Sequence, residues 1–168
     1  GRRVAETDQA GVSTEFGYDA LGRLTRVSDA LGGVTRYAYD EAGNLVAQAD
    51  AEGRTTTYEY DARGRRVHRT LPLGERETYA FDLAGTLTAM TDFNGRTTTF
   101  SYDALYRLLR KTPDASLAAP PVTFTYTATG QRATMSDPSG TTTYTYNERD
   151  WLTNKTWGST GVAPVPFS

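Results

Sequence analysis

One histidine, a recurring aspartate and paired aromatic rings are the side chains in this sequence that could do chemistry. His68 could act as a general base or bind a metal ion, and it lies in the polar segment Arg-Arg-Val-His-Arg at residues 65–69. The chain has no second histidine and no cysteine, so a metal ion at His68 would lack its usual nitrogen and sulfur ligands. We therefore interpret His68 as one residue of a polar strand, and we predict no catalytic, cofactor-binding or metal-binding residue.

The aspartates recur at a fixed distance from glycine, in the pattern Asp-x-x-Gly. Carboxylates can perform acid–base catalysis or bind calcium, but the calcium-binding pattern Gly-Gly-x-Gly-x-Asp does not occur. Asp at the first position and Gly at the fourth are typical of a type I turn followed by a left-handed residue, a common short hairpin connection. The predicted structural turn residues are Asp19, Gly22, Asp29, Gly32, Asp40, Gly43, Asp50, Gly53, Asp61, Gly64, Asp82, Gly85, Asp92, Gly95, Asp137 and Gly140.

The aromatic residues come in pairs with one residue between them, and a pair recurs about every 21 residues. Such rings could stack on sugars, but their strict period favours packing within the repeat. Trp151 and Trp157 lie outside the pairs, so they are the better candidates for a ligand or partner contact, unless they cover the end of the sheet. The predicted structural aromatic residues are Tyr18, Tyr37, Tyr39, Tyr58, Tyr60, Tyr79, Phe81, Phe100, Tyr102, Phe124, Tyr126, Tyr144 and Tyr146.

Short strands joined by these turns are the elements that must position the side chains. The turns start 10 or 11 residues apart wherever the series is unbroken, which leaves six or seven residues between them. Alternating Thr and Tyr, as in residues 55–60, favour strands over helices. The pattern predicts an all-β meander of about fourteen strands, built from tandem hairpins of about 21 residues. A sheet this wide is expected to coil or close, so we predict a spiralling, strongly curved antiparallel sheet.

The strand period also predicts which side chains lie together. Residues two apart on a strand share a face, so a constant register places every aromatic pair on one face of the sheet. One leucine per repeat is expected to fill the space between the aromatic strands, and an arginine near the start of the second strand is expected to bond a carboxylate in a neighbouring turn. The leucines are Leu24, Leu45, Leu87, Leu108 and Leu152, and the arginines are Arg23, Arg65 and Arg107.

The repeat is irregular in four places. Residues 71–74 (Leu-Pro-Leu-Gly) replace an aspartate turn, and residues 103–106 (Asp-Ala-Leu-Tyr) lack the glycine. A three-residue insertion falls in segment 113–121, where we expect an ordered surface loop or an irregular crossing. Residues 147–150 (Asn-Glu-Arg-Asp) are expected to form a weakened turn.

The bulk composition excludes several function classes. A net charge of −2 argues against nucleic acid as a partner, because phosphate binding needs a basic surface. The apolar runs are only a few residues long, so we predict no membrane insertion. We expect residues 1–157 to form the repeat region and residues 158–168 a Gly/Pro-containing tail. The chain begins at Gly1 without Met, and we expect it to be a piece of a longer polypeptide.

The repeated motif resembles that of a known family. Residues 18–24 read Tyr-Asp-Ala-Leu-Gly-Arg-Leu, and residues 39–45 and 60–65 repeat this pattern. They resemble the YD repeat of the Rhs (rearrangement hot spot) family, which includes bacterial polymorphic toxins, the C components of insecticidal toxin complexes, and teneurins. The resemblance covers about residues 4–157.

The resemblance implies a spiralling β-shell that encloses a toxic C-terminal polypeptide in a secreted or cell-surface protein. The family's self-cleaving aspartyl core lies after the repeats, and no counterpart is found in this sequence. The expected function is therefore a non-enzymatic wall of such a shell, with the rest of the longer polypeptide as its partner. Open sheet edges also predict self-association, a curled barrel-like closure, or edges covered by the tail. A surface-exposed glycan- or protein-binding module is the alternative, and a β-propeller is the rival architecture.

Overall fold

Fifteen β-strands and one short 3₁₀ helix make up the computed structural model, which describes residue 2 and residues 4–159. The prediction of an all-β meander of tandem hairpins is confirmed, with fifteen strands in place of about fourteen. The strands are β1 (Ala5–Thr7), β2 (Ser13–Tyr18), β3 (Leu24–Ser28), β4 (Val34–Tyr39), β5 (Leu45–Ala49), β6 (Thr55–Tyr60), β7 (Arg66–Thr70), β8 (Arg76–Phe81), β9 (Leu87–Thr91), β10 (Thr97–Tyr102), β11 (Leu108–Thr112), β12 (Val122–Tyr126), β13 (Arg132–Asp137), β14 (Gly140–Tyr146) and β15 (Leu152–Ser159), and the helix is η1 (Ala115–Leu117).

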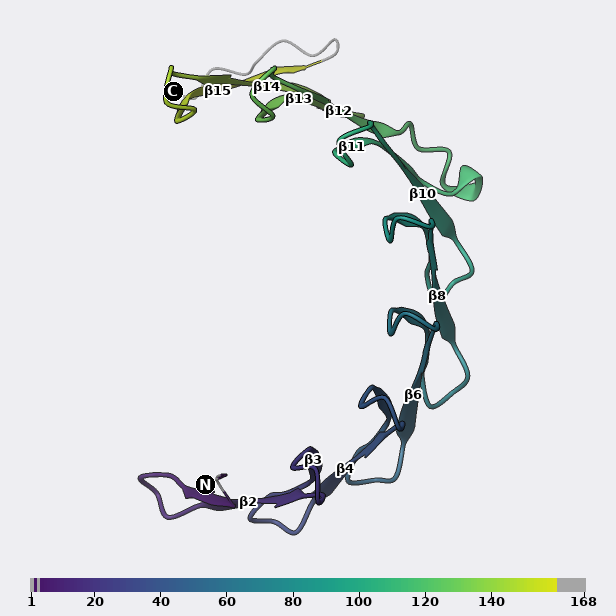
Figure 1. Cartoon of the computed structure of the whole chain (residues 1–168), viewed down its shortest axis with the longest axis vertical. Helices are drawn as coiled ribbons and strands as arrows, with labels where there is room; N and C mark the ends of the chain where they lie inside the picture. The colour runs from purple at the N-terminus through teal and green to yellow at the C-terminus, as the bar shows by residue number, and fades with distance from the viewer. Residues whose placement is uncertain (1, 3, 160–168) are drawn as a thin grey trace. The chain divides into compact units, whose positions relative to one another are not determined.

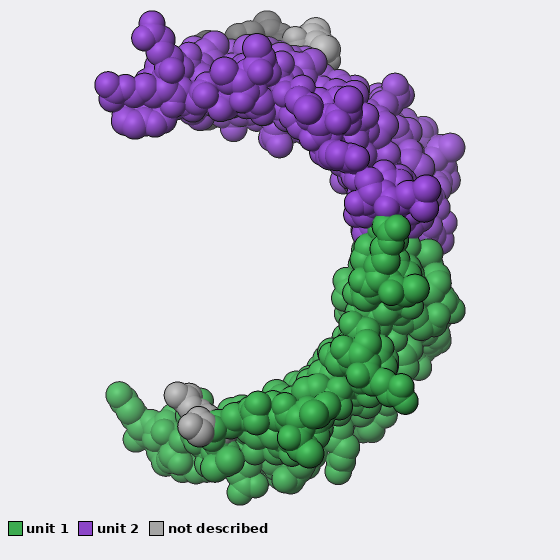
Figure 2. All heavy atoms as spheres, in the orientation of Figure 1, with its two compact units in different colours: residues 1–79 green, residues 80–168 purple. Residues whose placement is uncertain are grey.

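The strands form one antiparallel sheet in which their order along the chain is also their order in space. The chain divides into two compact units, Gly1–Tyr79 and Ala80–Ser168, and the division falls inside β8 (Figure 2). Because each strand returns antiparallel to the one before it, the connections alternate between the two ends of the strands (Figure 1). The repeat therefore contains two rows of turns.

We name the two rows by the strand that precedes them. The A turns follow the aromatic strands, and the B turns follow the other strands. The A turns are residues 19–23, 40–44, 61–65, 82–86, 103–107, 127–131 and 147–151. The regular B turns are residues 8–12, 29–33, 50–54, 71–75 and 92–96.

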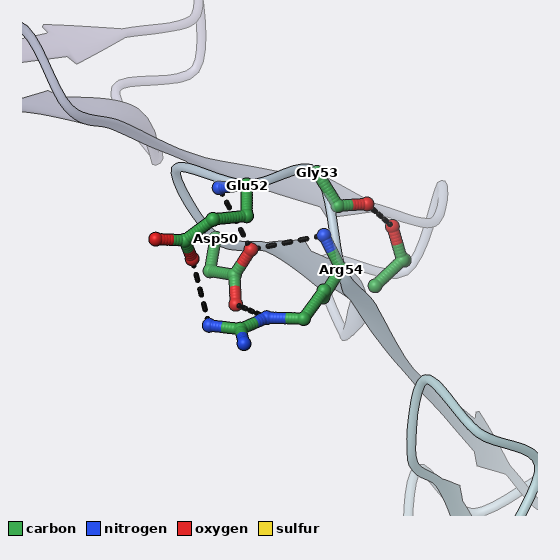
Figure 3. Close-up of polar contacts among 5 residues, drawn as sticks. Asp50, Glu52, Gly53 and Arg54 are labelled. Atoms are coloured by element: carbon green, nitrogen blue, oxygen red, sulfur yellow. Dashed lines mark hydrogen bonds and ion pairs between the residues drawn. The ribbon is translucent and has the colours of Figure 1, made fainter.

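Asp50 shows why the Asp-x-x-Gly sequence reverses the chain. The backbone N–H of Gly53 donates to the carbonyl of Asp50 at 3.0 Å, and the N–H of Asp50 donates to the carbonyl of Arg54 at 3.0 Å. One oxygen of the Asp50 carboxylate accepts the N–H groups of Glu52, at 3.1 Å, and Arg54, at 2.9 Å (Figure 3). The side chain thus replaces water for two N–H groups inside the turn, while Gly53 takes a φ of 80° without a Cβ clash.

A β-bulge follows each A turn for which the register of the flanking strands is defined. Leu45 lies directly opposite Tyr39, and Ala47 lies opposite Ala38, so that Val46 is an extra residue between two pairs. The extra residues in the two units are Thr25, Val46, Val67, Leu109, Ala133 and Thr153. Bulges of this kind increase the local twist of a strand pair. Where the next strand begins with leucine, the bulge also places that leucine directly across from the second aromatic of the pair, as at Leu24, Leu45, Leu108 and Leu152. Arginine holds this position opposite Tyr60 and Tyr126.

The two faces of the sheet differ in side-chain size. Tyr58 and Tyr60 alternate with Thr57 and Glu59 along β6, and the tyrosines are the less exposed residues of the four. The face opposite the aromatics carries hydroxyl groups that hydrogen-bond across strands, as between Thr125 and Thr134 at 2.7 Å. Large rings therefore cover one face, and the other carries polar side chains, among them hydroxyl groups, Glu59 and His68.

No apolar side chain of the described residues is buried, and the buried polar residues are Ser28 and Thr142. The rings on the aromatic face are half-buried by their neighbours within the sheet. A single sheet without a second layer has no closed core, so its stability comes from contacts between adjacent strands. This arrangement explains how a chain with 38% hydrophobic residues folds without a central core.

The irregular segments keep the meander but change the turns. The glycine missing from residues 103–106 is replaced by Tyr106, which takes a left-handed φ of 60°, and Asp150 does the same at 59°. Segment 113–121 contains η1, and Asp114 caps it by accepting the N–H of Ser116 at 2.9 Å. The helix ends at Ala118, which is left-handed with a φ of 47°.

The prediction of a three-residue turn from Asp137 to Gly140 is wrong. Asp137 and Gly140 are paired across β13 and β14, so that only two residues lie between the strands. Gly140 begins β14 with a φ of 151°, a conformation that disfavours any side chain. The shorter turn accounts for the spacing of 20 residues between Tyr126 and Tyr146, where the four spacings from Tyr18 to Tyr102 are 21.

At the carboxyl end, β15 continues through Gly158 and Ser159. The remaining residues of the predicted tail, 160–168, lie outside the described residues, so the boundary at residue 157 stays a prediction. Within the described residues, no helix has the length and apolar character needed to cross a membrane.

Candidate functional site

Several A turns hold a polar cluster that connects one repeat to the next, and we treat this cluster as the candidate site. In the first unit, Asp19 accepts the backbone N–H of Arg23 at 2.8 Å and its Nε at 2.7 Å. The Arg23 guanidinium lies 4.9 Å from the centre of the Tyr39 ring. Its Nη1 donates to the carbonyl of Asp40 at 3.0 Å, and Tyr39 donates its hydroxyl back to the carbonyl of Leu24 at 2.8 Å.

The contacts in this cluster run in both directions between adjacent repeats. Arginine from one A turn reaches the tyrosine and the backbone of the next repeat, and that tyrosine reaches back to the first strand after the turn. Each hydrogen bond is worth about 1 kcal/mol and an exposed cation–π contact about 0.5–1 kcal/mol. The cluster therefore stabilises the interface between repeats as well as the turn itself.

The same geometry recurs along both units. The tyrosine hydroxyl reaches a backbone carbonyl at Tyr60 (to Leu45, 2.9 Å), Tyr126 (to Leu108, 2.8 Å) and Tyr146 (to Arg132, 2.9 Å). In the second unit, Arg107 bonds Asp103 at 2.7 Å and lies 4.7 Å from the centre of the Tyr126 ring. The site is thus a periodic feature of the sheet.

Hydrogen bonding holds the A-turn carboxylates in the ionised form. The backbone N–H and side chain of Arg23 keep the pKa of Asp19 below its ordinary value. The side chain of Arg65 has the same effect on the pKa of Asp61, with a further contribution from its backbone N–H. A general acid or base needs a pKa near the working pH, and a lowered pKa moves a carboxylate away from that range. These aspartates are placed as structural counter-ions.

The structure places the predicted turn glycines in turns, apart from Gly140. Gly22, Gly32, Gly43, Gly53, Gly64, Gly85 and Gly95 all have left-handed φ values between 73° and 97°. Gly22 also meets a close neighbour, because an added Cβ would overlap the guanidinium of Arg2. That guanidinium is the far end of a flexible side chain and can move aside, so the left-handed φ of 76° is what favours glycine at this A turn.

The predicted aromatic residues divide into two roles. At Tyr39, Tyr60, Tyr126 and Tyr146, the second ring of the pair carries a hydroxyl that bonds the preceding repeat. The first ring is approached by cations from the facing strand, as at Phe124, where Arg132 lies 5.0 Å from the ring centre. Cations above these rings occupy surfaces that a sugar would need for stacking.

The expectation that arginines bond carboxylates of neighbouring turns is wrong for the pairs that the structure defines. Arg23, Arg65 and Arg107 each bond the aspartate four residues earlier, in their own turn. The reason is geometric, because the first and fifth residues of this turn are directly paired and their side chains project together. Arg23 does reach the neighbouring turn, but there it donates a hydrogen bond to the backbone carbonyl of Asp40.

The sequence analysis did not identify two features of the A turn. It did not recognise that the fifth residue varies between repeats, and it did not predict a hydrogen bond from the tyrosine hydroxyl. The fifth residues are Arg23, Asn44, Arg65, Thr86, Arg107, Gln131 and Trp151. A signal was present, since the second aromatic is tyrosine in every repeat except that of Phe81. Packing alone would accept Phe, so the preference for Tyr indicates a hydroxyl with a partner.

His68 lies on β7 with its Nδ1 3.1 Å from the hydroxyl of Thr78. It faces Glu59 across the strand pair, on the face opposite the aromatics. Over the part of the chain that the structure describes, no group of three or more His, Asp or Glu side chains is arranged to hold a metal ion. Trp151 and Trp157 are 64% and 55% exposed, in keeping with a position at the end of the sheet.

The fold and this site define a class of protein: an antiparallel β-hairpin repeat in which polar clusters at one row of turns join the repeats. The RHS Repeat family matches residues 1–34, 18–50, 39–76 and 81–116, which together make up more than half of the chain. The chain therefore belongs to the RHS repeat family, as the YD motifs predict. No curated protein sequence matches it.

Solved structures similar to this chain come from Tc toxin complexes. The crystal structure of TcdB2-TccC3-Cdc42 matches with a TM-score of 0.77 and 18% identity over 91% of this chain. The Tc holotoxin pore of Photorhabdus luminescens matches with a TM-score of 0.74 and 20% identity over 89% of this chain. In both cases this chain spans 9% of the length of the matching chain. At these identities the likeness shows a common fold.

Proposed function

We propose that this chain is a non-enzymatic segment of the wall of a shell that encloses a polypeptide cargo. The observation that carries the proposal is the strand order: every strand follows its sequence neighbour in one sheet, with no buried apolar side chain in the described residues. Such a sheet separates two spaces without forming a globule. A continuous hydrogen-bonded ladder leaves no gap for a protease or for a folding partner to enter.

Two further facts support the proposal. The chain belongs to the RHS repeat family, and it shares its fold with chains of Tc toxin complexes that are far longer than it is. On this view the partner of the wall is the rest of the longer polypeptide, including a toxic cargo, and the protein acts outside the producing cell or at its surface. The A-turn clusters would then keep neighbouring repeats joined while the cargo is enclosed.

The test is limited proteolysis of the longer polypeptide that contains this chain. A wild-type wall should protect an internal cargo segment, whereas a flexible glycine insertion between Ala20 and Leu21 should open the A turn and expose that segment. An insertion of the same length between Ala51 and Glu52, in a B turn, is the matched control and should leave protection intact. Equal cleavage of the cargo in all three proteins would disprove enclosure.

Exposed tryptophans favour a second candidate function, a glycan- or protein-binding module. Trp151 and Trp157 are more than half exposed, and large exposed rings are frequent at binding surfaces. A glycan array probed with the chain and with its Trp157→Ala variant tests this candidate. Binding that is lost in the variant would support it, and an array without binding would reject glycan recognition.

The terminal strands suggest self-association of the isolated chain. In the described sheet β1 and β15 stand at the two ends of the strand order, so each has one edge without a neighbouring strand of this chain. Such edges are templates for pairing with another chain. Light scattering over a range of concentrations should show a mass that rises with concentration, and a constant monomer mass would contradict the expectation.

A further inference from the structure

A groove lies between two A turns of the first unit, beside Tyr60. It has a volume of about 720 Å³, and Asp40, Asn44, Tyr60 and Asp61 are among the residues that line it. The groove occurs where the fifth residue of an A turn is Asn44, whereas Arg23 holds the equivalent position one repeat earlier. The two repeats can therefore be compared position by position.

Arg23 shows what the equivalent space receives in the preceding repeat. Its guanidinium meets three features: the Asp19 carboxylate at 2.7 Å, the Tyr39 ring at 4.9 Å and the carbonyl of Asp40 at 3.0 Å. These features belong to the turn itself, to the tyrosine of the next repeat and to the first residue of the next turn. Together they form a cradle for one planar cation.

Arg107 occupies the same cradle in the second unit. Its Nε bonds Asp103 at 2.7 Å, and its guanidinium lies 4.7 Å from the centre of the Tyr126 ring. The guanidinium also extends toward the next turn, where its Nη1 would lie 3.9 Å from a Cβ added to Gly130. Two separate repeats thus place a guanidinium against the carboxylate of its own turn and the tyrosine ring of the next repeat, and direct it toward the next turn.

The groove at Tyr60 presents these three features again. The Asp40 carboxylate, the Tyr60 ring and the backbone of Asp61 hold the positions of Asp19, Tyr39 and Asp40 one repeat earlier. Asn44 reproduces only the first contact, because its Nδ2 donates to Asp40 at 2.9 Å and its side chain ends there. The space that the rest of an arginine would fill is part of the groove.

Asp40 differs from the other two carboxylates that line the groove, those of Glu59 and Asp61, in its bonding partner. Asp61 is paired with Arg65 at 2.6 Å, and Glu59 is paired with Arg76 at 3.0 Å. Asp40 instead accepts its hydrogen bonds from the neutral side-chain amide and backbone N–H of Asn44, which lower its pKa and keep it ionised. Arg63 also lines the groove, so the selectivity must come from the cradle and not from net charge.

We propose that the groove beside Tyr60 binds the guanidinium group of an arginine side chain from another polypeptide. Arginine suits the cradle because its planar group can stack on the tyrosine ring while it bonds a carboxylate and a carbonyl in one plane. A lysine ammonium could neutralise Asp40 but could not stack in this way. The inference rests on the comparison of repeats and is independent of what the longer protein encloses.

The experiment is a titration of the isotope-labelled chain, followed by NMR at the Asn44 side-chain amide and the Tyr60 ring. The probes are arginine, lysine and citrulline, each blocked by an N-acetyl and a C-methylamide group. We expect saturable shifts with blocked arginine, with affinity on the order of tenfold above that of blocked citrulline, and a weaker response to blocked lysine. Equal responses to arginine and lysine would overturn the proposal in favour of nonspecific charge attraction.

Two reciprocal variants make the test sharper. Asn44→Arg should fill the groove from within the chain and abolish the response at Tyr60. Arg23→Asn should open an equivalent groove and create a new response at Tyr39. Each variant turn combines a first and a fifth residue that are already combined in another A turn of this sequence, so both should fold, and circular dichroism checks that they do. A response at Tyr60 that survives Asn44→Arg, or no response at Tyr39 in Arg23→Asn, would overturn the proposal.

A second groove in the other unit serves as an internal control. It has a volume of about 540 Å³ and is lined by Tyr146, but its first turn begins with Thr127 in place of aspartate. The fifth residue there is Gln131, which bonds the Thr127 hydroxyl at 3.0 Å. Without the turn carboxylate, Tyr146 should not respond to blocked arginine, and a response equal to that at Tyr60 would show that the cradle is not the cause.

Discussion

The two rows of turns perform different tasks, although both use aspartate and glycine. Every A turn has the same length, and its first side chain accepts the N–H of its fifth residue, even where Thr127 or Asn147 replaces aspartate. The B turns include the Leu-Pro-Leu-Gly sequence at 71–74, the insertion at 113–121 and the two-residue connection after Asp137. Irregularity in length is confined to one row.

The difference follows from what each turn contacts. The A turn at Asp19 is bonded to the next repeat through Arg23 and through the Tyr39 hydroxyl, which returns to the strand after the turn. A B turn such as 50–54 is closed by bonds among its own residues, including an ion pair of 2.7 Å between Arg54 and Glu52 (Figure 3). A turn whose bonds are internal can change without affecting its neighbours. The period of the repeat is therefore set at the A turns.

Lengthening one turn in each row is the strongest way to break this comparison. We expect three glycines between Ala20 and Leu21, in an A turn, to cost about 2–3 kcal/mol more unfolding free energy than three between Ala51 and Glu52, in a B turn. The A insertion removes hydrogen bonds of about 1 kcal/mol each and a cation–π contact, whereas loop lengthening alone costs well under 1 kcal/mol. Urea unfolding followed by circular dichroism measures the difference. Equal costs would show that the two rows are equivalent.

The contribution of a single aspartate to stability at low pH can be compared between an A turn and a B turn. Arg65 keeps the pKa of Asp61 low, and Arg54 does the same for Asp50, both chiefly through side-chain hydrogen bonds. A lowered folded-state pKa gives stability that is complete above the unfolded value and is lost as the pH falls through the folded one. Asp61→Asn should therefore flatten the loss of stability in acid.

Asp50→Asn is the matched control for that measurement. Its carboxylate is 35% exposed against 23% for Asp61, and its partner Arg54 is 64% exposed against 26% for Arg65, so solvent screens the B-turn pair more. We expect a smaller change in the acid limb for Asp50→Asn than for Asp61→Asn. A larger change at Asp50 would contradict the idea that the A row carries more of the coupling.

The tyrosine hydroxyl can be removed alone. Tyr39→Phe keeps the ring but loses the bond to the Leu24 carbonyl, and we expect a loss of about 1 kcal/mol in unfolding free energy. Tyr37→Phe, in the first ring of the same pair, should change stability by less than about 0.5 kcal/mol. Urea unfolding of both variants provides the comparison, and equal losses would argue that the hydroxyl does not couple the repeats.

The repeating parts of the fold could be predicted from the sequence, because each relies on a local rule. Asp and Gly three residues apart predict a turn, alternation predicts a strand, and a constant period extends both along the chain. The bulge after each A turn could not be predicted, since it depends on the pairing between two strands. At Leu45, for example, it depends on how β5 pairs with β4. The two-residue turn at Asp137 escaped prediction for a similar reason, because a one-residue deletion does not reveal which turn absorbs it.

Only part of the candidate site could be predicted from the sequence. The tyrosines and the arginines stood out by their period, but Asn44 did not, since its role depends on how far Arg23 reaches into the next repeat. A contact between residues 16 or 17 apart on adjacent repeats has no local sequence rule. The variable fifth position becomes meaningful only when one repeat is laid over another in three dimensions.

The smallest expected effect is a gain, obtained by making one B turn regular. The turn at Leu71 closes through its backbone, with the N–H of Gly74 donating to the Leu71 carbonyl at 2.9 Å, but leucine offers no side-chain acceptor for the N–H groups within it. Leu71→Asp should restore that acceptor and raise the unfolding free energy by about 0.5–1 kcal/mol, as measured in urea. Leu73→Ser at the tip, where the side chain is 90% exposed, is the control and should be neutral. If Leu71→Asp destabilises the chain, the contacts of the leucine side chain contribute more stability than the hydrogen bonds that aspartate adds to the turn. The B turns would then depend on contacts with their surroundings as well as on their own hydrogen bonds.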